Sequence, residues 1–228
     1  IAFKVDTWRK CFELLKPGGH LIAFSGSRTY HRMAVAIEDA GFEIRDQCIW
    51  LYGSGFPKSH KVGEGWGTAL KPAHEPMVLA RKPIDQKSVA DNVLRHSVGG
   101  INIDDCRVQC EPDDDIVRPD RTDAQAYNFF RGGEQDRINV RKTTRQQPSS
   151  EQIQEINARG RFPSNVMHDG SCVVEDVFPD VSSRYFYTAK TNQAERNAGA
   201  NNTHPTVKPV ELMRYLVRLV TPKEGLVL

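Results

Sequence analysis

The stretch "HLIAFSGSRTYHRMAVAIEDAGFEIRDQCIWLYG", residues 20–53, decides the fold that we expect for this chain. Residues 20–24 are a nearly continuous apolar run between glycines, which is typical of a parallel strand covered on both faces. A helix is predicted over about Arg28 to Ala40 and ends at Gly41, with apolar residues facing inward at Tyr30, Met33 and Ile37. Residues 42–53 then carry apolar residues at near-alternate positions, as a half-buried strand does. The order strand, helix, strand predicts an α/β sheet.

The residues on either side of this stretch extend the pattern. Apolar residues at helical spacing predict a helix from Val5 to Leu15, and "KPGG" at residues 16–19 ends it. Downstream, "HEPMVLARK" at residues 74–82 predicts another strand. A glycine-rich loop rather than a helix joins it to the strand before it, so these two strands can pair antiparallel.

The composition changes at about Pro83. From there to about Pro163 the chain has long polar runs with few periodic apolar positions, so it is either an inserted functional module or partly disordered. Regular patterns resume with a predicted strand in "SRYFYTAK", residues 183–190. A closing helix follows, with Leu212, Leu216 and Leu219 expected to face inward, and "GLVL" at residues 225–228 predicts the first residues of a buried strand.

The composition does not indicate a function, but it narrows the cellular location that we expect for the protein. The chain is 39% hydrophobic with a formal net charge of +2, which excludes neither a nucleic-acid partner nor a small substrate. No apolar run approaches the roughly 18 residues of a membrane span, and "IAFKVDTWRK" at the start lacks the features of a signal peptide. The five cysteines form no disulfide framework, which fits reduced thiols. We therefore expect a cytoplasmic location.

The segment "NTHPTVKP", residues 202–209, is a candidate anion site. Pro209 in the first turn of the closing helix gathers His204, Thr206 and Lys208 at the helix N-terminus. Unpaired N–H donors and an ammonium group there suit a carboxylate or a phosphate. The alternative is a plain helix cap, in which Thr206 satisfies the backbone and Lys208 points to solvent.

The glycine-rich loop "GSGFPKSHKVGEGWG", residues 53–67, can bring its backbone close to a ligand, although it lacks the spacing of a phosphate-binding loop. Its Phe56 and Trp66, together with Trp50 and Tyr52, can stack on an extruded base. Aromatic residues at a strand end also serve as core, and this alternative stays open.

The polar region after Pro83 contains a basic cluster that follows Tyr127, Phe129 and Phe130. Basic residues near aromatic residues suit phosphate contact and base stacking. Aspartates earlier in the region bring its charge close to neutral, so a solvated surface is the alternative. The members of the cluster are Arg131, Arg137, Arg141, Lys142 and Arg145.

The sequence gives little support for a metal site or for the catalytic residues of a hydrolase. Cys106 and Cys110, and His168 and Cys172, have spacings that depart from the usual zinc knuckle, and the two pairs lie far apart in sequence. No G-x-S-x-G elbow occurs. We expect no metal site.

Seven stretches together resemble the site-specific DNA methyltransferases that methylate the exocyclic amine of adenine (N6) or cytosine (N4). Their order along the chain is also that of the family. They are "LLKPGGHLIAF", "IWLYGSGFPKSHKV", "AHEPMVLARKP", "VGGINIDDCRV", "GRFPSNVMHDGS", "SRYFYTAKTNQAER" and "NTHPTVKPVELMRYLVRLVTPKEGLVL".

The resemblance implies a fold, a cofactor and a partner. It implies a partial Rossmann-like sheet that binds S-adenosyl-L-methionine at the carboxyl ends of its strands, with an inserted target-recognition region that contacts double-stranded DNA. Residues 1–82 would be the rest of the catalytic half, residues 83–163 the recognition region, and residues 164–228 the start of the cofactor-binding half. The implied cofactor residues are Asn202, Thr203, His204, Thr206 and Lys208. The implied target-base residues are Trp50, Tyr52, Phe56, Pro57 and Lys58, and the basic cluster is the candidate DNA contact.

The resemblance also implies an incomplete enzyme. The family's catalytic Asp/Asn/Ser-Pro-Pro-aromatic tetrapeptide, which orients the exocyclic amine, and its glycine-rich cofactor turn do not occur in this sequence. We therefore expect an inactive fragment of a methyltransferase, with adenine-N6 favoured. The alternatives are a non-catalytic DNA-binding remnant, or a subunit of a split enzyme. An RNA or protein methyltransferase is less favoured, because the recognition-side stretches match as well.

Overall fold

The chain is described from a computed structural model, which covers residues 1–53, 55–57, 59–109, 149, 154–155, 158–177, 186–188, 190–199, 202 and 207–228. The chain divides into two compact units. One comprises Ile1–Val108 with Phe162–Leu228, and the other comprises Gln109–Arg161. The elements described below belong to the first unit.

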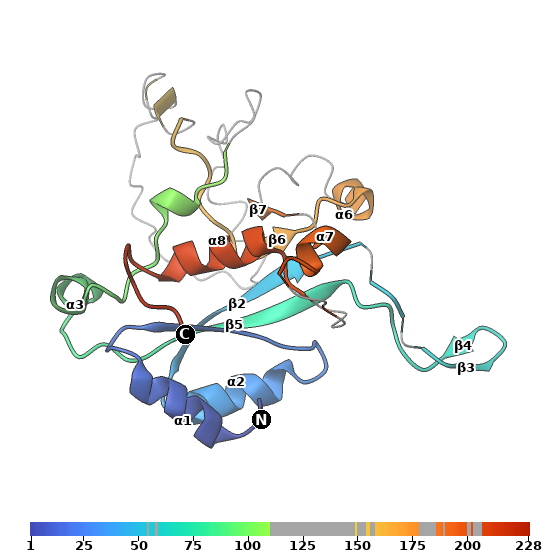
Figure 1. The fold of residues 1–228 in the computed structure, drawn as a ribbon, viewed down its shortest axis with the longest axis horizontal. Helices are drawn as coiled ribbons and strands as arrows, with labels where there is room; N and C mark the ends of the chain where they lie inside the picture. Colours follow the sequence, from blue (N-terminus) through green and yellow to red (C-terminus); the bar gives the residue numbers. More distant parts are fainter. Residues whose placement is uncertain are drawn as a thin grey trace, which may run out of the picture. The chain divides into compact units, whose positions relative to one another are not determined.

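A mixed five-stranded sheet forms the centre of this unit (Figure 1). In spatial order its strands are β1 (His20–Phe24), β5 (His74–Arg81), β2 (Glu43–Leu51), β6 (Val166–His168) and β7 (Phe186–Tyr187). β5 pairs antiparallel with both β1 and β2, whereas β6 pairs parallel with β2, and β7 pairs parallel with β6. The predicted α/β class and the antiparallel pairing of residues 42–53 with residues 74–82 are confirmed.

The prediction that residues 20–24 form a parallel strand within the sheet is wrong. β1 pairs antiparallel with β5 and is the outermost strand on one side of the described sheet. The reason is topological: the chain returns from β2 through a loop, so β5 runs in the opposite direction and inserts between β1 and β2. The apolar run therefore identified a strand, but it did not reveal the antiparallel pairing, and Ala23 is the one fully buried residue of this strand.

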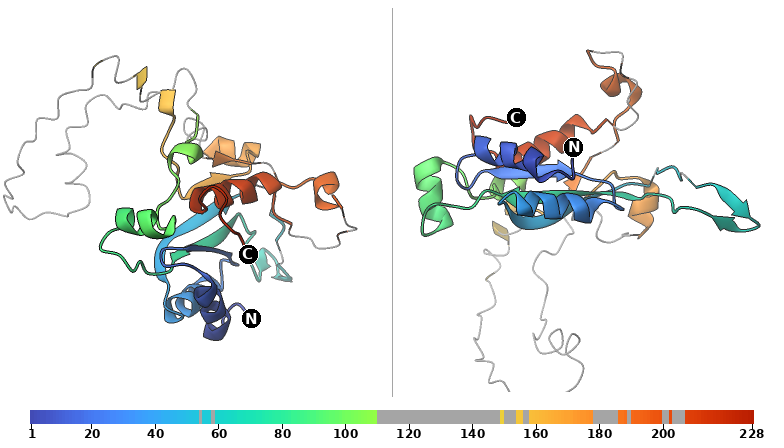
Figure 2. Two further views of the ribbon diagram at one scale, coloured as in Figure 1. Left: turned by 60° about the vertical axis from the view of Figure 1, so that its left-hand side comes forward. Right: turned by 90° about the horizontal axis from the view of Figure 1, so that it is seen from below.

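Helices cover both faces of the sheet (Figures 1 and 2). On one face, α1 (Val5–Leu14) and α2 (Tyr30–Asp39) pack on a core that includes Ile37, Phe42 and Val78. On the other, α8 (Val210–Val220) packs on a core that includes Cys48, Trp50, Met77 and Met167. The predicted inward residues of the closing helix, Leu212, Leu216 and Leu219, are all buried in that second core.

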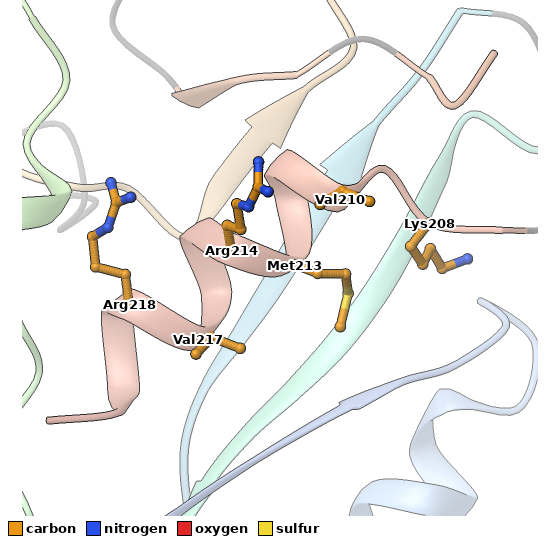
Figure 3. A pocket seen from close by; sticks show the side chains of 6 residues that line it. All are labelled: Lys208, Val210, Met213, Arg214, Val217 and Arg218. Carbon is orange, nitrogen blue, oxygen red and sulfur yellow. The ribbon is translucent and has the colours of Figure 1, made fainter. Parts of the chain in front are cut away.

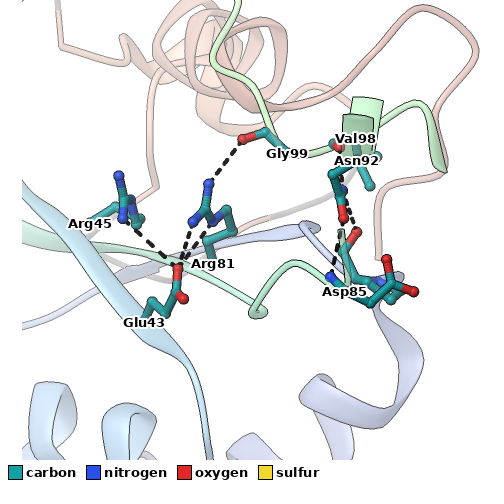
Figure 4. A network of polar contacts seen from close by, with 8 residues as sticks. Glu43, Arg45, Arg81, Asp85, Asn92, Val98 and Gly99 are labelled. Carbon is teal, nitrogen blue, oxygen red and sulfur yellow. Dashed lines mark hydrogen bonds and ion pairs between the residues drawn. The ribbon is translucent and has the colours of Figure 1, made fainter. Parts of the chain in front are cut away.

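Some short elements were not predicted. They are β3 (Lys61–Gly63), β4 (Trp66–Gly67), α3 (Val89–His96), the 3-10 turn η1 (Asp104–Cys106), α6 (Cys172–Val177) and α7 (Gln193–Arg196). The buried residue of α3 is Asn92 rather than an apolar residue. Its Nδ2 donates to Pro17 O at 3.0 Å and to Val98 O at 2.8 Å, and its Oδ1 accepts from Asp85 N at 3.4 Å (Figure 4). Polar contacts therefore attach this helix, which explains why apolar periodicity did not reveal it.

The predicted buried strand at residues 225–228 is wrong. These residues form no strand, and Leu226 and Leu228 are exposed. A strand requires a neighbour for its backbone hydrogen bonds, and none of the described strands pairs with this segment.

Candidate functional site

The carboxyl ends of the parallel-running strands meet at one edge of the sheet. β1, β2, β6 and β7 all run in the same direction, and β5 runs against them, so β5 begins at that same edge. The residues gathered there are those just after β1, β2, β6 and β7 and those that open β5. Open α/β sheets bind ligands at this position.

A hydrogen-bonded carboxylate ties two of these strand ends together. Asp169, which directly follows β6, is buried, and its Oδ2 accepts a hydrogen bond from Gly53 N at 3.2 Å. Ser171 Oγ accepts from the same amide at 3.1 Å and donates to Asp169 Oδ1 at 2.7 Å. Asp169 N in turn donates to Leu51 O at 3.0 Å. The end of β2 and the segment after β6 are therefore held in fixed register.

Two lysines lie against aromatic rings at this edge. Lys190 Nζ lies 3.8 Å from the ring centroid of Tyr52, within cation–π distance. The ammonium of Lys208 forms an ion pair with the carboxylate of Glu75, the second residue of β5, and lies 5.2 Å from the ring centroid of Phe24, the last residue of β1. The Lys208 side chain is only 20% exposed, so it does not point into solvent.

Ammonium and carboxylate groups lie close enough together at this edge of the sheet to affect one another electrostatically. Burial lowers the pKa of Lys190, repulsion from Lys208 and Lys71 lowers it further, and attraction by Asp169 and Glu75 opposes these effects. Three ammonium groups and two carboxylates leave an excess of one positive charge among these groups. Such an arrangement suits a ligand that carries both charges, or an anionic ligand.

The predicted cofactor residues fall partly outside the described residues: Thr203, His204 and Thr206 lie outside them. Asn202 Nδ2 donates to Arg196 O at 3.4 Å. At the N-terminus of α8, Val210 N donates to Glu195 Oε1 at 2.8 Å. A carboxylate of the chain itself therefore uses the first amide of this helix, and Lys208 supplies the positive charge that faces the sheet edge.

A shallow hollow of about 410 Å³ runs along the outer side of α8 (Figure 3). Three of its lining residues are apolar and three are cationic. They are Lys208, Val210, Met213, Arg214, Val217 and Arg218. Lys208 thus contacts the sheet edge and also lines one end of this hollow.

The predicted target-base residues separate into two groups. Trp50 and Tyr52 are 3% and 8% exposed and belong to the core beneath α8, and Lys190 occupies one face of the Tyr52 ring. The alternative that aromatic residues at a strand end are core is thus realised for these two. Phe56 and Pro57 are exposed, whereas Lys58 lies outside the described residues.

The predicted DNA-binding cluster, Arg131, Arg137, Arg141, Lys142 and Arg145, lies outside the described residues. Within the described residues, no group of three or more His, Cys, Asp or Glu side chains is placed to hold a metal ion. None of the described helices is long and apolar enough to cross a bilayer.

Sequence reasoning missed Glu75, Asp169 and Lys190. Each lies in one of the seven quoted stretches: Glu75 at the start of β5, Asp169 directly after β6, and Lys190 three residues after β7. The signal that was available is position: a polar residue next to a buried strand comes to the ligand-binding edge whenever strand directions agree.

A family model described as DNA methylase matches residues 1–228. The chain belongs to this family of N6/N4 DNA methylases. The resemblance stated from the sequence is thereby confirmed. Type II methyltransferase M.HindIII of Haemophilus influenzae is 29% identical to this chain in a match of 116 residues, with 43% of this chain and 38% of M.HindIII covered. The match therefore spans about two fifths of that relative's length.

Several solved structures resemble this chain distantly. M1.HpyAVI in complex with SAM is 19% identical, with 35% of this chain and 38% of that chain covered at a TM-score of 0.27. M1.HpyAVI alone is 11% identical, with 86% of this chain and 80% of that chain covered at a TM-score of 0.30. TTHA0409 of Thermus thermophilus, which is described as a DNA modification methylase, is 15% identical. The match covers 90% of this chain and 79% of that chain at a TM-score of 0.29.

Proposed function

We propose that this chain is part of a site-specific DNA methyltransferase. The enzyme would transfer a methyl group from S-adenosylmethionine to the exocyclic amine of adenine (N6) or cytosine (N4) in double-stranded DNA, with adenine favoured. Membership of the DNA methylase family supports the reaction class. The observation that carries the assignment of the site is the ion pair between Lys208 and Glu75 at the carboxyl edge of the sheet.

The charges at this edge fit the cofactor. The methionine moiety of S-adenosylmethionine carries a carboxylate and an ammonium group, so it needs one cation and one anion close together. Lys208 suits the carboxylate, and Glu75 suits the ammonium group. Because Glu195 uses the first amide of α8, we assign the carboxylate to Lys208 rather than to the helix end. Asn202, Thr203, His204 and Thr206 complete the proposed pocket.

The residues after β2 fit the role of holding the target base. Phe56 and Pro57 are exposed and follow the strand end that Asp169 fixes, so we propose that they, with Lys58, contact the extruded nucleotide. Trp50 and Tyr52 support this loop from the core. The bound cofactor would supply an electrophilic methyl group, and these residues would hold the extruded base beside it and limit access of water.

We further propose that methyl transfer requires groups that this sequence does not contain. No Pro-Pro-aromatic tetrapeptide occurs in it, and the family uses this motif to position the amine. In this proposal residues 1–82 belong to the catalytic half, residues 83–163 form the recognition region, and residues 164–228 begin the cofactor-binding half. The basic cluster from Arg131 to Arg145 would contact phosphates.

In the methyltransferase of which we propose this chain to be a part, the Lys208→Ala variant tests the cofactor site. Titration calorimetry with S-adenosylmethionine should show binding about tenfold weaker or more, the loss expected for one charge-assisted contact. Gel shifts with duplex DNA should change by less than about twofold. Lys87→Ala is the matched control, because it removes the same charge at an exposed position after the opposite end of β5. Equal loss of cofactor and DNA binding, or unchanged cofactor binding, would remove Lys208 from the site.

A second candidate function is a DNA-binding remnant or a subunit of a split methyltransferase, which the missing tetrapeptide favours. Duplex binding that weakens with salt, without any heat of binding to S-adenosylmethionine, would support this second function. Salt-dependent duplex binding accompanied by cofactor binding supports the methyltransferase.

A further inference from the structure

Lys190 differs in its contacts from the two other lysines at the carboxyl edge of the sheet. Lys208 forms an ion pair with Glu75, and Lys71 Nζ donates to a backbone carbonyl at 2.6 Å. Lys190 is half-buried against the ring of Tyr52, and within the described residues its ammonium group has no hydrogen bond or ion pair. A charge that has lost part of its hydration is normally paired, so this position suits an anionic ligand.

The backbone is fixed on both sides of Lys190. Thr188 is buried, and its backbone N donates to His168 O at 3.0 Å. Thr191 is also buried, and its Oγ1 donates to Val207 O at 3.0 Å, which ties this segment to the one that precedes α8. A charged group whose backbone is already ordered loses less conformational entropy when a ligand binds.

The ring of Tyr52 connects Lys190 to the loop that carries Phe56. The hydroxyl of Tyr52 donates to His74 O at 3.4 Å, which restrains the ring. A Cβ added at Gly55 would lie 3.2 Å from Tyr52 Cε2 and 1.7 Å from a backbone carbonyl oxygen, so the loop backbone passes beside the ring and requires glycine there. Lys190 and the residue before Phe56 therefore contact the same ring.

Two anionic groups reach this edge of the sheet in the proposed function, the carboxylate of the cofactor and a phosphate of the DNA. Lys208 suits the carboxylate, because Glu75 beside it suits the ammonium group of the same methionine moiety. Lys190 has no carboxylate in ion-pair contact within the part of the chain that the structure describes, and it lies next to the target-base loop. A compact ammonium group without a paired anion favours a phosphate.

The half-buried position of Lys190 determines which phosphate it meets. The ring that it contacts, Tyr52, is only 8% exposed and belongs to the core beneath α8. A nucleotide that rotates out of the duplex brings its own backbone toward the pocket, whereas a stacked nucleotide keeps its phosphates on the outside of the double helix. Contact with Lys190 therefore requires extrusion.

We propose that Lys190 is a positioning residue that binds a phosphate next to the extruded nucleotide from the face of the Tyr52 ring. The proposal rests on the proposed function and names the group that holds the nucleotide backbone while the residues after β2 hold the base. The contact stabilises the extruded state more than the stacked state. Lys190 thus favours extrusion without contacting a base edge or the methyl donor.

The methyltransferase of which we propose this chain to be a part is the protein to test, and its target sequence is read by sequencing DNA that it has methylated. Duplexes with 2-aminopurine next to the target base report extrusion, because the fluorescence of this base rises when it loses a stacked neighbour. Lys190→Ala should reduce this rise and weaken binding to the target duplex about tenfold, the loss expected for one charge-assisted contact. Lys190→Arg keeps the charge and should restore most of the affinity.

Three measurements serve as controls. Lys190→Ala should change the affinity for a duplex without the target sequence by less than about twofold, and the affinity for S-adenosylmethionine equally little. Lys87→Ala removes the same charge at an exposed position and should leave both the fluorescence rise and the affinity for the target duplex unchanged.

The outcomes separate the two proposals. Unchanged target binding and fluorescence in Lys190→Ala overturn the phosphate contact and leave the methyltransferase assignment intact. Weaker cofactor binding with unchanged duplex binding assigns Lys190 to the cofactor carboxylate and overturns the contact. Equal losses for target and non-target duplexes, or for duplex and cofactor, also overturn it, because they show general attraction or a structural role. If the unchanged enzyme methylates no DNA and binds no S-adenosylmethionine, the proposed function fails and the role of Lys190 fails with it.

Discussion

Acidification should destabilise this fold through His20, the first residue of β1. His20 pairs with Arg81 of β5, and its buried Nδ1 has no hydrogen-bond partner in the described structure. Burial lowers the pKa of His20 to about 4, and the positive charges of Arg81 and Arg45 add to the effect. Arg81 cannot move away easily, because it is itself buried and donates to Glu43 Oε2 at 2.7 Å and to Gly99 O at 3.4 Å (Figure 4).

The magnitude follows from linkage between protonation and folding. The pKa falls from 6.5 to about 4, and each unit corresponds to about 1.36 kcal/mol, so the full effect is about 3 kcal/mol. Between these two values the unfolded chain binds more protons at His20 than the folded chain does. The stabilising contribution is therefore complete above pH 6.5 and is lost as the pH falls toward 4. At pH 5 the loss should reach about 2 kcal/mol.

Urea unfolding at pH 7.5 and pH 5 measures this effect. The free energy of unfolding is extrapolated to water for the unchanged chain and for His20→Gln, which does not titrate. Contributions of other groups are common to both proteins, so the difference between their pH dependences isolates His20. The unchanged chain should lose about 2 kcal/mol more than the variant between the two pH values. Equal losses in both proteins would refute the reasoning.

Further predictions concern the cores and the polar attachment of α3. Leu216→Ala should lower the free energy of unfolding by about 2 to 5 kcal/mol in urea, because it leaves a cavity beneath α8. Asn92→Ala leaves the carbonyls of Pro17 and Val98 without their donor and should lower it by about 2 to 4 kcal/mol, whereas exposed Leu94→Ala should change it little. Burial raises the pKa of the Cys48 thiol to about 11, so a thiol reagent at pH 8 should modify exposed Cys172 rapidly and Cys48 only on unfolding, as peptide mapping would show.

Local pattern predicted the longer elements whose buried faces are apolar, but it missed the three-residue strand β6, although Met167 in it is buried. The helices at residues 5–14, 30–39 and 210–220 and the strands at 43–51 and 74–81 all show this periodicity, and all are present. The direction of β1 was not predictable in this way, because a five-residue apolar run looks the same in parallel and antiparallel pairings. α3 was not predicted, because a hydrogen-bonded asparagine attaches this helix to the rest of the fold and a stripe of apolar residues does not.

The candidate site was predicted only in part for a different reason. Lys208 was found because it adjoins a recognisable helix start. Its partner Glu75 lies more than a hundred residues earlier, and only the order of strands in the sheet brings the two together. The roles of Trp50 and Tyr52 could not be decided from sequence, because a strand-end aromatic residue faces core or ligand depending on which helix covers that face.

The position of α8 has a consequence for biosynthesis. It is the only described α-helix whose side chains join the core at Trp50 and Met77, yet its residues, 210–220, follow β5 by well over a hundred positions. At about 5 to 20 residues per second, a ribosome needs on the order of ten seconds to deliver this helix after β1, β2 and β5 have emerged. During that interval an uncovered apolar sheet face is open to aggregation, so we expect the nascent chain to depend on chaperones until α8 docks.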